Sequence, residues 1–213
     1  MSDFDWDEFE AAIRLLKSGV DKLPFRDVIK AATGHNILPF NDSTRAVVRK
    51  LDEWISVNVQ HLSNHIESEY IGRPNELGNY LERILLNDFQ RDLAPSIRCE
   101  MPRTISGHAQ AVGYPDGVIF TQNEVMYFDV KIYQAKTKDT TLRSFYYQPT
   151  NQSKIHHDAP HFLIGFEVES IDGNNSSPFR IVDYSIVDVY DMNVNFKAEF
   201  NTNNRNIYNL ERP

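Results

Sequence analysis

The sequence predicts an α/β (α+β) protein in which helices flank a central mixed β-sheet and a helical region precedes that sheet. Three patterns in the 213 residues predict this fold class. Apolar residues recur at helical spacing over most of residues 3–89. Two short apolar runs then flank the turn-like residues 121–124, which is typical of a β-hairpin. A continuous apolar run at residues 162–168 is typical of a central strand.

Three helices are expected in the N-terminal region, residues 1–70. The first covers residues 3–17, and a second, shorter helix closes near Gly34. The third starts at the cap-like Asn41-Asp42-Ser43 and has a long amphipathic stripe. These helices carry no evident chemistry, so we interpret their apolar faces as core packing, with a dimer interface as the alternative.

A fourth helix is expected to begin near Pro74 or Asn75 and to be buried, because its apolar face is wide. Glu82 falls inside the apolar sector, whereas Glu76 falls outside it. A glutamate embedded among leucines needs a partner, because an unpaired buried charge is costly. That partner is either an Arg or Lys in a structural ion pair or a metal ion shared with other acids.

Further strands are expected on both sides of the hairpin. A short one is expected at residues 97–100, and two more at 179–190 and 194–200, as antiparallel edge strands. No internal repeat or low-complexity segment divides the chain. We therefore interpret residues 1–213 as one domain, in which residues 75–213 form the core around the sheet.

Charged residues stand at both ends of the expected hairpin. Asp116 precedes the first arm, and Asp129 and Lys131 end the second. Asp129 and Lys131 are two residues apart, so they point to one face of their strand. Two carboxylates and an ammonium would then converge beside an apolar core, which is costly unless a cation compensates them. Two hard carboxylates suit Mg²⁺, and the lysine suits an attacking water, so the residues suggest metal-assisted phosphodiester hydrolysis.

Pro115-Asp116, twelve further residues and then Asp129-Val130-Lys131 resemble the PD-(D/E)xK nuclease signature in its D-x-K form. The resemblance implies a restriction-endonuclease-like core in which Asp116, Asp129 and the backbone carbonyl of Val130 hold Mg²⁺. It implies that Lys131 activates the water. Because this family often places a glutamate on the helix before the catalytic hairpin, it also favours Glu82 as a third acid, with Glu76 as the alternate.

Residues 73–82 and 142–161 are also similar to type II restriction enzymes. The resemblance thus implies a site-specific deoxyribonuclease that cuts double-stranded DNA and leaves 5′-phosphate ends. One motif per chain and two strands to cut imply a homodimer. A companion DNA methyltransferase encoded nearby and a prokaryotic cytoplasm fit such a restriction system. A repair, recombination or structure-specific nuclease and a non-enzymatic binding module with a solvated hairpin are the alternatives.

The segment 134–158 is the expected DNA-recognition surface, because it is polar and has little periodicity. The net charge of the chain is −8, but from Lys131 to His161 five Lys and Arg face only two Asp. Basic side chains suit phosphates, whereas Arg, Asn and Gln suit base edges, although each residue taken singly could equally be an exposed loop residue. The DNA-contact candidates are Lys136, Lys138, Arg143, Ser144, Gln148, Asn151, Gln152, Lys154 and His156.

Composition excludes several other classes. Hydrophobic residues make up 41% and charged residues 24% of the chain, as in ordinary soluble proteins. No apolar run approaches the roughly 18–20 residues of a membrane span. The acidic N-terminus lacks the basic and apolar regions of a signal peptide. Cys99 is the only cysteine, so no internal disulfide forms, and we expect it to be a small buried hydrophobe.

Overall fold

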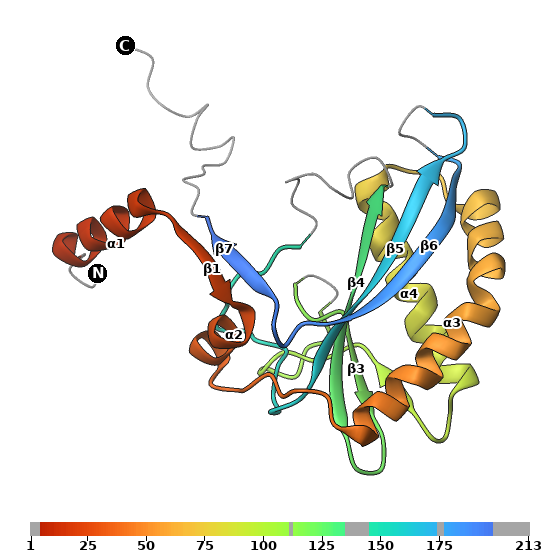
Figure 1. Cartoon of the computed structure of the whole chain (residues 1–213), viewed down its shortest axis with the longest axis horizontal. Coiled ribbons are helices and arrows are strands. Elements are labelled where there is room, and N and C mark those ends of the chain that lie inside the picture. The colour runs from red at the N-terminus through yellow and green to blue at the C-terminus, as the bar shows by residue number, and fades with distance from the viewer. Residues whose placement is uncertain (1–4, 111–112, 135–144, 174–176, 198–213) are drawn as a thin grey trace. The chain divides into compact units, whose positions relative to one another are not determined.

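The computed structural model describes residues 5–110, 113–134, 145–173 and 177–197. Helices dominate the first half of the chain and strands the second, as Figure 1 shows. The elements in chain order are α1 (Trp6–Ser18), β1 (Val20–Pro24), α2 (Phe25–Thr33), α3 (Asp42–Glu69), α4 (Pro74–Asp92), β2 (Arg98–Glu100), β3 (Gly117–Phe120), β4 (Val125–Gln134), β5 (His161–Ser170), β6 (Phe179–Asp188) and β7 (Asn193–Phe196).

The chain divides into two compact units, and the larger one spans residues 25–192. It contains a five-stranded sheet with the strand order β2-β3-β4-β5-β6. β4 and β5 are parallel, while the other neighbouring pairs are antiparallel. The predicted mixed sheet flanked by helices is therefore confirmed. The expected central strand at 162–168 is β5, and β6 is the expected antiparallel edge strand.

Two long helices cover the same side of this sheet (Figure 1). α3 starts with Asn41, whose side chain accepts a hydrogen bond from the Thr44 backbone while Thr44 caps Asn41 in return. It packs against β6, where the hydroxyl of Ser63 accepts a hydrogen bond of 2.9 Å from the backbone N–H of Ile181. α4 lies against β2 and β4. The apolar stripe of α3 thus packs into the core against the sheet, as its interpretation as core packing predicts.

The core between the helices and the sheet alternates along β4. Met126, Phe128 and Val130 are buried in the apolar cluster that α3 and α4 also line. The intervening side chains, including Tyr127 and Asp129, point to the other face because strand side chains alternate. The same alternation along β5 sends Phe162 and Ile164 into that cluster. This pattern leaves the opposite face of β4 for the charged residues.

The smaller unit joins the two ends of the chain. β1 and β7 form an antiparallel pair in which Leu23 lies opposite Val194. α1 begins at Asp5, whose side chain accepts hydrogen bonds from the backbone of Asp7 and Glu8, and it ends at Gly19 with a φ of 74°. The strand predicted at 194–200 is found as β7 only over Asn193–Phe196, and residues 198–200 lie outside the described residues; its partner β1 was not predicted. The five residues of β1 show no strong alternation of apolar and polar side chains, so the sequence pattern is too weak to predict a strand there.

In the described ranges, no helix is long and apolar enough to cross a membrane.

Candidate active site

The predicted hairpin forms and brings its charged ends together. β3 pairs with β4 from Gly117, opposite Phe128, to Phe120, opposite Val125. β4 then continues to Gln134, beyond its pairing with β3, which ends at Phe128 on this edge of β4. Asp116, the residue before β3, occupies the start of this edge. The candidate site is therefore built where the two strands part.

The carboxylate of Asp116 is bonded directly to β4. Its backbone N–H donates to the carbonyl of Phe128 at 3.0 Å. Its Oδ2 accepts a hydrogen bond of 2.8 Å from the N–H of Val130. These two bonds tie Asp116 to the backbone of β4, so the geometry of that backbone fixes the position of the Asp116 carboxylate. Asp116 consequently lies beside Asp129, as the motif predicts.

Asp129 and Lys131 form an ion pair on the face of β4 opposite Met126, Phe128 and Val130, which pack into the apolar core. The side chain of Asp129 is 3% exposed and that of Lys131 is 25% exposed. The Lys131 ammonium also donates to the carbonyl of Val130 at 3.1 Å. Burial, and then the nearby charge of Asp116, raise the pKa of Asp129 to about 7, against the opposing effect of Lys131. A buried carboxylate of this kind is stabilised further by any cation that binds beside it.

Glu82 of α4 is the third acid of the cluster. It is 6% exposed. Burial, and then Asp116, raise its pKa to about 7, whereas Lys154 opposes the rise. Among the described residues it makes no salt bridge with an Arg or Lys, although the charges of Lys154 and Lys131 act on it. Glu76, the alternate acid, is instead exposed in the first turn of α4. Burial, and then the charge of Glu76, raise the pKa of Tyr70.

Lys154 belongs to the same cluster, which the sequence did not indicate. It is 3% exposed, and its ammonium donates to the carbonyl of Gln110 at 3.2 Å. Burial lowers the pKa of Lys154, while the carboxylates of Asp116, Glu82 and Asp129 act in the opposite direction. We expected it among the exposed phosphate contacts. No spacing rule connects it to the hairpin, because it comes from the irregular segment before β5.

A buried Tyr114–His161 pair supports the turn before Asp116. The Tyr114 hydroxyl lies 2.7 Å from Nδ1 of His161, and the two rings stack at 5.7 Å. Burial lowers the pKa of His161 to about 3, so its imidazole is neutral at physiological pH. Burial, and then Asp129, raise the pKa of Tyr114 well above its ordinary value. Tyr114 and His161 are therefore both uncharged at physiological pH.

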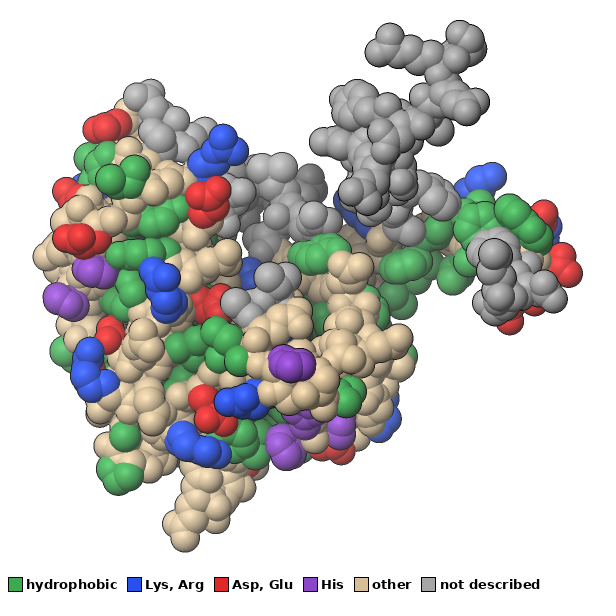
Figure 2. Space-filling view, turned by 180° about the vertical axis from the view of Figure 1, so that it is seen from behind, with side chains coloured by type: hydrophobic (Ala, Val, Ile, Leu, Met, Phe, Trp, Pro, Cys, Tyr) green, Lys and Arg blue, Asp and Glu red, His purple; other side chains and the backbone are tan. Residues whose placement is uncertain are grey.

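Apart from the buried Lys154, the expected DNA contacts fall into three groups. Gln148, Asn151 and Gln152 are exposed, and Oε1 of Gln152 accepts a hydrogen bond of 2.8 Å from Ser106. His156 is exposed too, but its Nε2 lies 2.7 Å from the carbonyl of Arg103. Figure 2 shows Lys and Arg interspersed with acidic side chains on the face it displays. Four candidates lie outside the described residues, namely Lys136, Lys138, Arg143 and Ser144.

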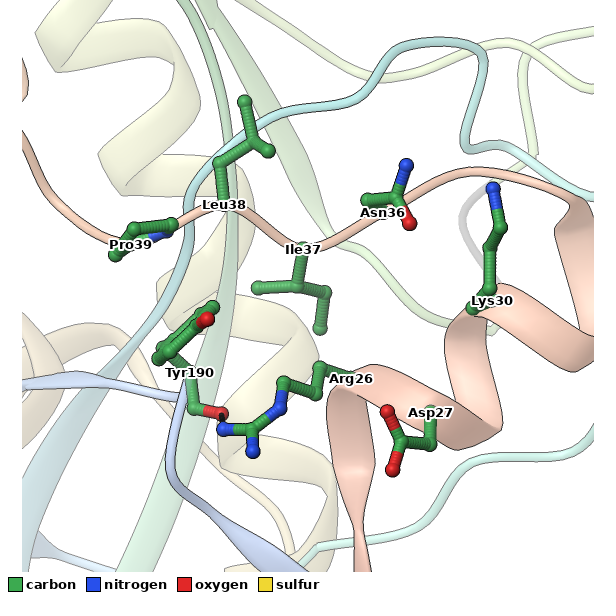
Figure 3. Close-up of a pocket in the computed structure, with 8 residues that line it drawn as sticks. All are labelled: Arg26, Asp27, Lys30, Asn36, Ile37, Leu38, Pro39 and Tyr190. Carbon is green, nitrogen blue, oxygen red and sulfur yellow. Dashed lines mark hydrogen bonds between the residues drawn. The ribbon is translucent and has the colours of Figure 1, made fainter.

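A separate pocket of about 270 Å³ lies between α2, residues 36–39 and Tyr190 (Figure 3). Its cations are already engaged within the protein. Arg26 donates to the Tyr190 carbonyl at 3.0 Å and to Asp191 at 2.9 Å, and its guanidinium lies 4.7 Å from the Tyr190 ring centroid. Lys30 donates to the carbonyl of Gly34 at 2.7 Å. Arg26 thus ties α2 to the turn after β6, and Lys30 closes the C-terminal end of α2, so both charges are used within the protein.

The carboxylate cluster has the donor chemistry of a hard divalent cation. Its side chains present only oxygen ligands, and the Asp129 carboxylate is nearly fully buried beside a second acid. Within the described ranges, no group of three or more His, Cys, Asp and Glu side chains is arranged to hold a metal ion unaided. Mg²⁺ does not require such a cage, because it commonly binds through one or two carboxylates, several waters and a substrate phosphate. The residues therefore fit Mg²⁺.

Replacing Glu82 with glutamine is expected to flatten the pH dependence of stability in the metal-free protein. Because the folded-state pKa of Glu82 is raised from 4.5 to about 7, the folded protein holds this proton more tightly than the unfolded chain. The resulting stabilisation is full below the unfolded pKa and is lost as pH rises through about 7. Urea unfolding in EDTA at about pH 5 and about pH 8 measures the difference. An equal loss of unfolding free energy between these two pH values in the wild type and in Glu82→Gln would contradict the interpretation of Glu82 as a buried acid.

Comparisons with known proteins give one family and one relative. The model of the "Type II restriction enzyme MjaV family" matches residues 18–211. The type II restriction enzyme MjaV from Methanocaldococcus jannaschii is 24% identical over 228 residues, which cover 95% of this chain and 92% of that relative. No solved structure matches the chain significantly.

Proposed function

Because this chain belongs to the MjaV family of type II restriction enzymes, we propose that the carboxylate cluster of Glu82, Asp116 and Asp129, where β3 and β4 part, is its Mg²⁺-dependent catalytic centre. Because the members of this family are type II restriction enzymes, the chain is a DNA-cleaving, site-specific endonuclease. It therefore favours this activity over the repair nuclease and the non-enzymatic module. The observation that carries the proposal is the bond between Asp116 Oδ2 and the Val130 N–H, which fixes one acid beside the other.

Each residue of the cluster has a proposed role. Asp116 and Asp129 would hold the cation, with the Val130 carbonyl as a further oxygen ligand. Bound Mg²⁺ supplies positive charge to the phosphate and acidifies water. Lys131, already paired with Asp129, is placed to orient the attacking water and to neutralise charge that develops on the phosphate oxygens. Glu82 would orient a water on the α4 side of the cluster.

Hydrolysis by in-line attack on phosphorus would leave a 5′-phosphate and a 3′-hydroxyl. A chain with one such cluster cuts one strand at a time, so we propose a homodimer on a palindromic or nearly palindromic site. Exposed Gln148, Asn151 and Gln152 have amides suited to base edges, adenine above all. The proposed setting is a prokaryotic cytoplasm in which a companion methyltransferase protects the host DNA.

Digestion of phage DNA is expected to require a divalent cation. With Mg²⁺, the purified protein should give discrete bands, because a site-specific enzyme cuts each molecule at the same places. With EDTA, no bands should form. End-labelling with polynucleotide kinase checks the products: 5′-phosphate ends should accept label only after phosphatase treatment. A smear in place of bands would contradict site specificity, and equal cutting in EDTA would contradict the metal site.

A further inference from the structure

An aromatic cluster joins three distant segments of the chain beside the proposed catalytic centre. Phe25 begins α2, and Tyr114 directly precedes Pro115-Asp116. Phe145 and Tyr147 belong to the segment before β5. The ring of Phe25 is edge-on to the other three rings, at centroid distances of 5.3, 5.0 and 5.6 Å. The cluster therefore ties the segment before β5 to the residue next to the motif.

Phe145 is the ring of this cluster that reaches a charged residue of the motif. Its centroid lies 5.8 Å from Nζ of Lys131, within the roughly 6 Å over which an aromatic face attracts a cation. The same ring is edge-on to Phe25 at 5.0 Å and to Tyr114 at 5.7 Å. Phe25 is fully buried, and its backbone N–H donates to the Met192 carbonyl at 2.8 Å. Buried neighbours thus hold the Phe145 ring beside the lysine.

The Lys131 ammonium has other contacts only on its own strand among those described. It forms the ion pair with Asp129 and donates to the Val130 carbonyl at 3.1 Å. A lysine side chain is a flexible four-carbon stem, and a quarter of this one is exposed. Contacts from one strand leave such a stem free to turn toward water. The Phe145 ring is a contact from a different segment, and an aromatic face favours the ammonium where it now lies.

We propose that Phe145 is a positioning residue, whose ring holds the Lys131 ammonium beside Asp129 for catalysis. This inference rests on the proposed role of Lys131. Phe145 acts through the lysine and not on the reacting atoms, so its loss lowers the rate of the bound complex and leaves DNA affinity unchanged. The competing explanation is that Phe145 only packs against Phe25 and Tyr114, in which case any large apolar side chain would serve.

Single-turnover cleavage of a short phage DNA duplex that contains one cut site tests the inference. Phe145→Leu should lower the maximal rate roughly fivefold to thirtyfold, because a partly desolvated cation–π contact is lost. The enzyme concentration at half the maximal rate should not change. Phe145→Tyr keeps an aromatic face and should cleave within about twofold of the wild type. Tyr147→Leu removes a ring that also packs edge-on against Phe25 and Tyr114, and should keep the wild-type rate.

NMR of protein labelled with ¹³C-lysine tests the contact itself, without DNA or metal. The face of an aromatic ring shifts nearby protons upfield. The ε-methylene signal of Lys131 should therefore lie upfield of that of Lys50, which is exposed on α3. It should move downfield in Phe145→Leu and stay upfield in Phe145→Tyr. Its absence from the spectrum of Lys131→Arg assigns the signal.

The outcomes separate the inference from the proposed function. A Phe145→Leu variant that cleaves at the wild-type maximal rate overturns the role of Phe145, and so does a Phe145→Tyr variant as slow as Phe145→Leu. Equal slowing by Tyr147→Leu overturns it too, because the loss then comes from packing of the cluster. If Phe145→Leu does not fold, a wild-type Lys131 signal without the upfield shift still overturns it. A Lys131→Gln variant that cleaves at the wild-type rate overturns the proposed role of Lys131, and the inference with it.

Discussion

Replacing Asp129 with asparagine is expected to lower the rate of DNA cleavage by roughly a thousandfold or more while the protein stays folded. A bound cation contributes several kcal/mol of transition-state stabilisation, and each 1.4 kcal/mol or so is tenfold in rate. Asparagine keeps the shape of the side chain but removes the charge that holds the cation and pairs with Lys131. Initial rates of plasmid linearisation in Mg²⁺, at saturating enzyme, measure the loss.

DNA binding provides the readout that separates catalysis from folding. In Ca²⁺, or without metal, Asp129→Asn should still shift a duplex that carries the recognition sequence in a gel, because the proposed contacts lie on other residues. Asp172→Asn, in an exposed turn after β5, is the matched control and should cut at the wild-type rate. An Asp129→Asn variant that retains more than about a tenth of wild-type cleavage would exclude Asp129 as the essential metal ligand.

The hairpin and its paired residues were predictable because strand geometry is local. A spacing of two places Asp129 and Lys131 on one face of any strand, and the ion pair confirms this placement. The turn at residues 121–124 sets the register, so Asp116 necessarily returns beside Asp129. For the same reason helical periodicity could separate Glu82 from Glu76: a period of 3.6 residues is enough to tell a buried face from an exposed one.

Lys154 was not predictable, because its position depends on contacts between segments that are distant in the chain. A lysine in a polar stretch is expected to be exposed to solvent, as its neighbours Asn151 and Gln152 are. Only the folded loop shows that Ser153 is anchored to Ile105 and that the Lys154 side chain is buried with its ammonium on the Gln110 carbonyl. The β1–β7 pair was missed for a related reason, since the two strands come from opposite ends of the chain.

Replacing Gly117 with alanine is expected to destabilise the catalytic hairpin by about 2–3 kcal/mol, because core overpacking of one methyl group costs about that much. A Cβ at this position would overlap the ring of Phe128 on the paired strand. Phe128 cannot move aside easily, since it is fully buried and its ring stacks on Phe162 at 5.7 Å. For a chain of this size the melting temperature should fall by roughly 5–10 °C.

A second glycine supplies the opposite expectation. Gly78 lies inside α4, where an added Cβ would come no closer than 3.7 Å to Ile132. Gly78→Ala should therefore stabilise the protein by about 0.5–1 kcal/mol through helix propensity. If glycine content alone governed these sites, both substitutions would raise the melting temperature. The two substitutions change stability in opposite directions because Phe128 leaves no space for a Cβ at Gly117, whereas Gly78 has space for one.

A double-mutant cycle locates the cost of Gly117→Ala in the clash with Phe128. Phe128→Leu removes part of the ring, so Gly117→Ala should cost at least about 1 kcal/mol less in that background than in the wild type. Additive effects would mean that the methyl group strains the backbone of β3 instead. The clash also bears on catalysis. A ring pushed from its place disturbs the Phe128 carbonyl, which accepts the N–H of Asp116. Gly117→Ala should consequently weaken cleavage as well as stability, although it alters no charged group.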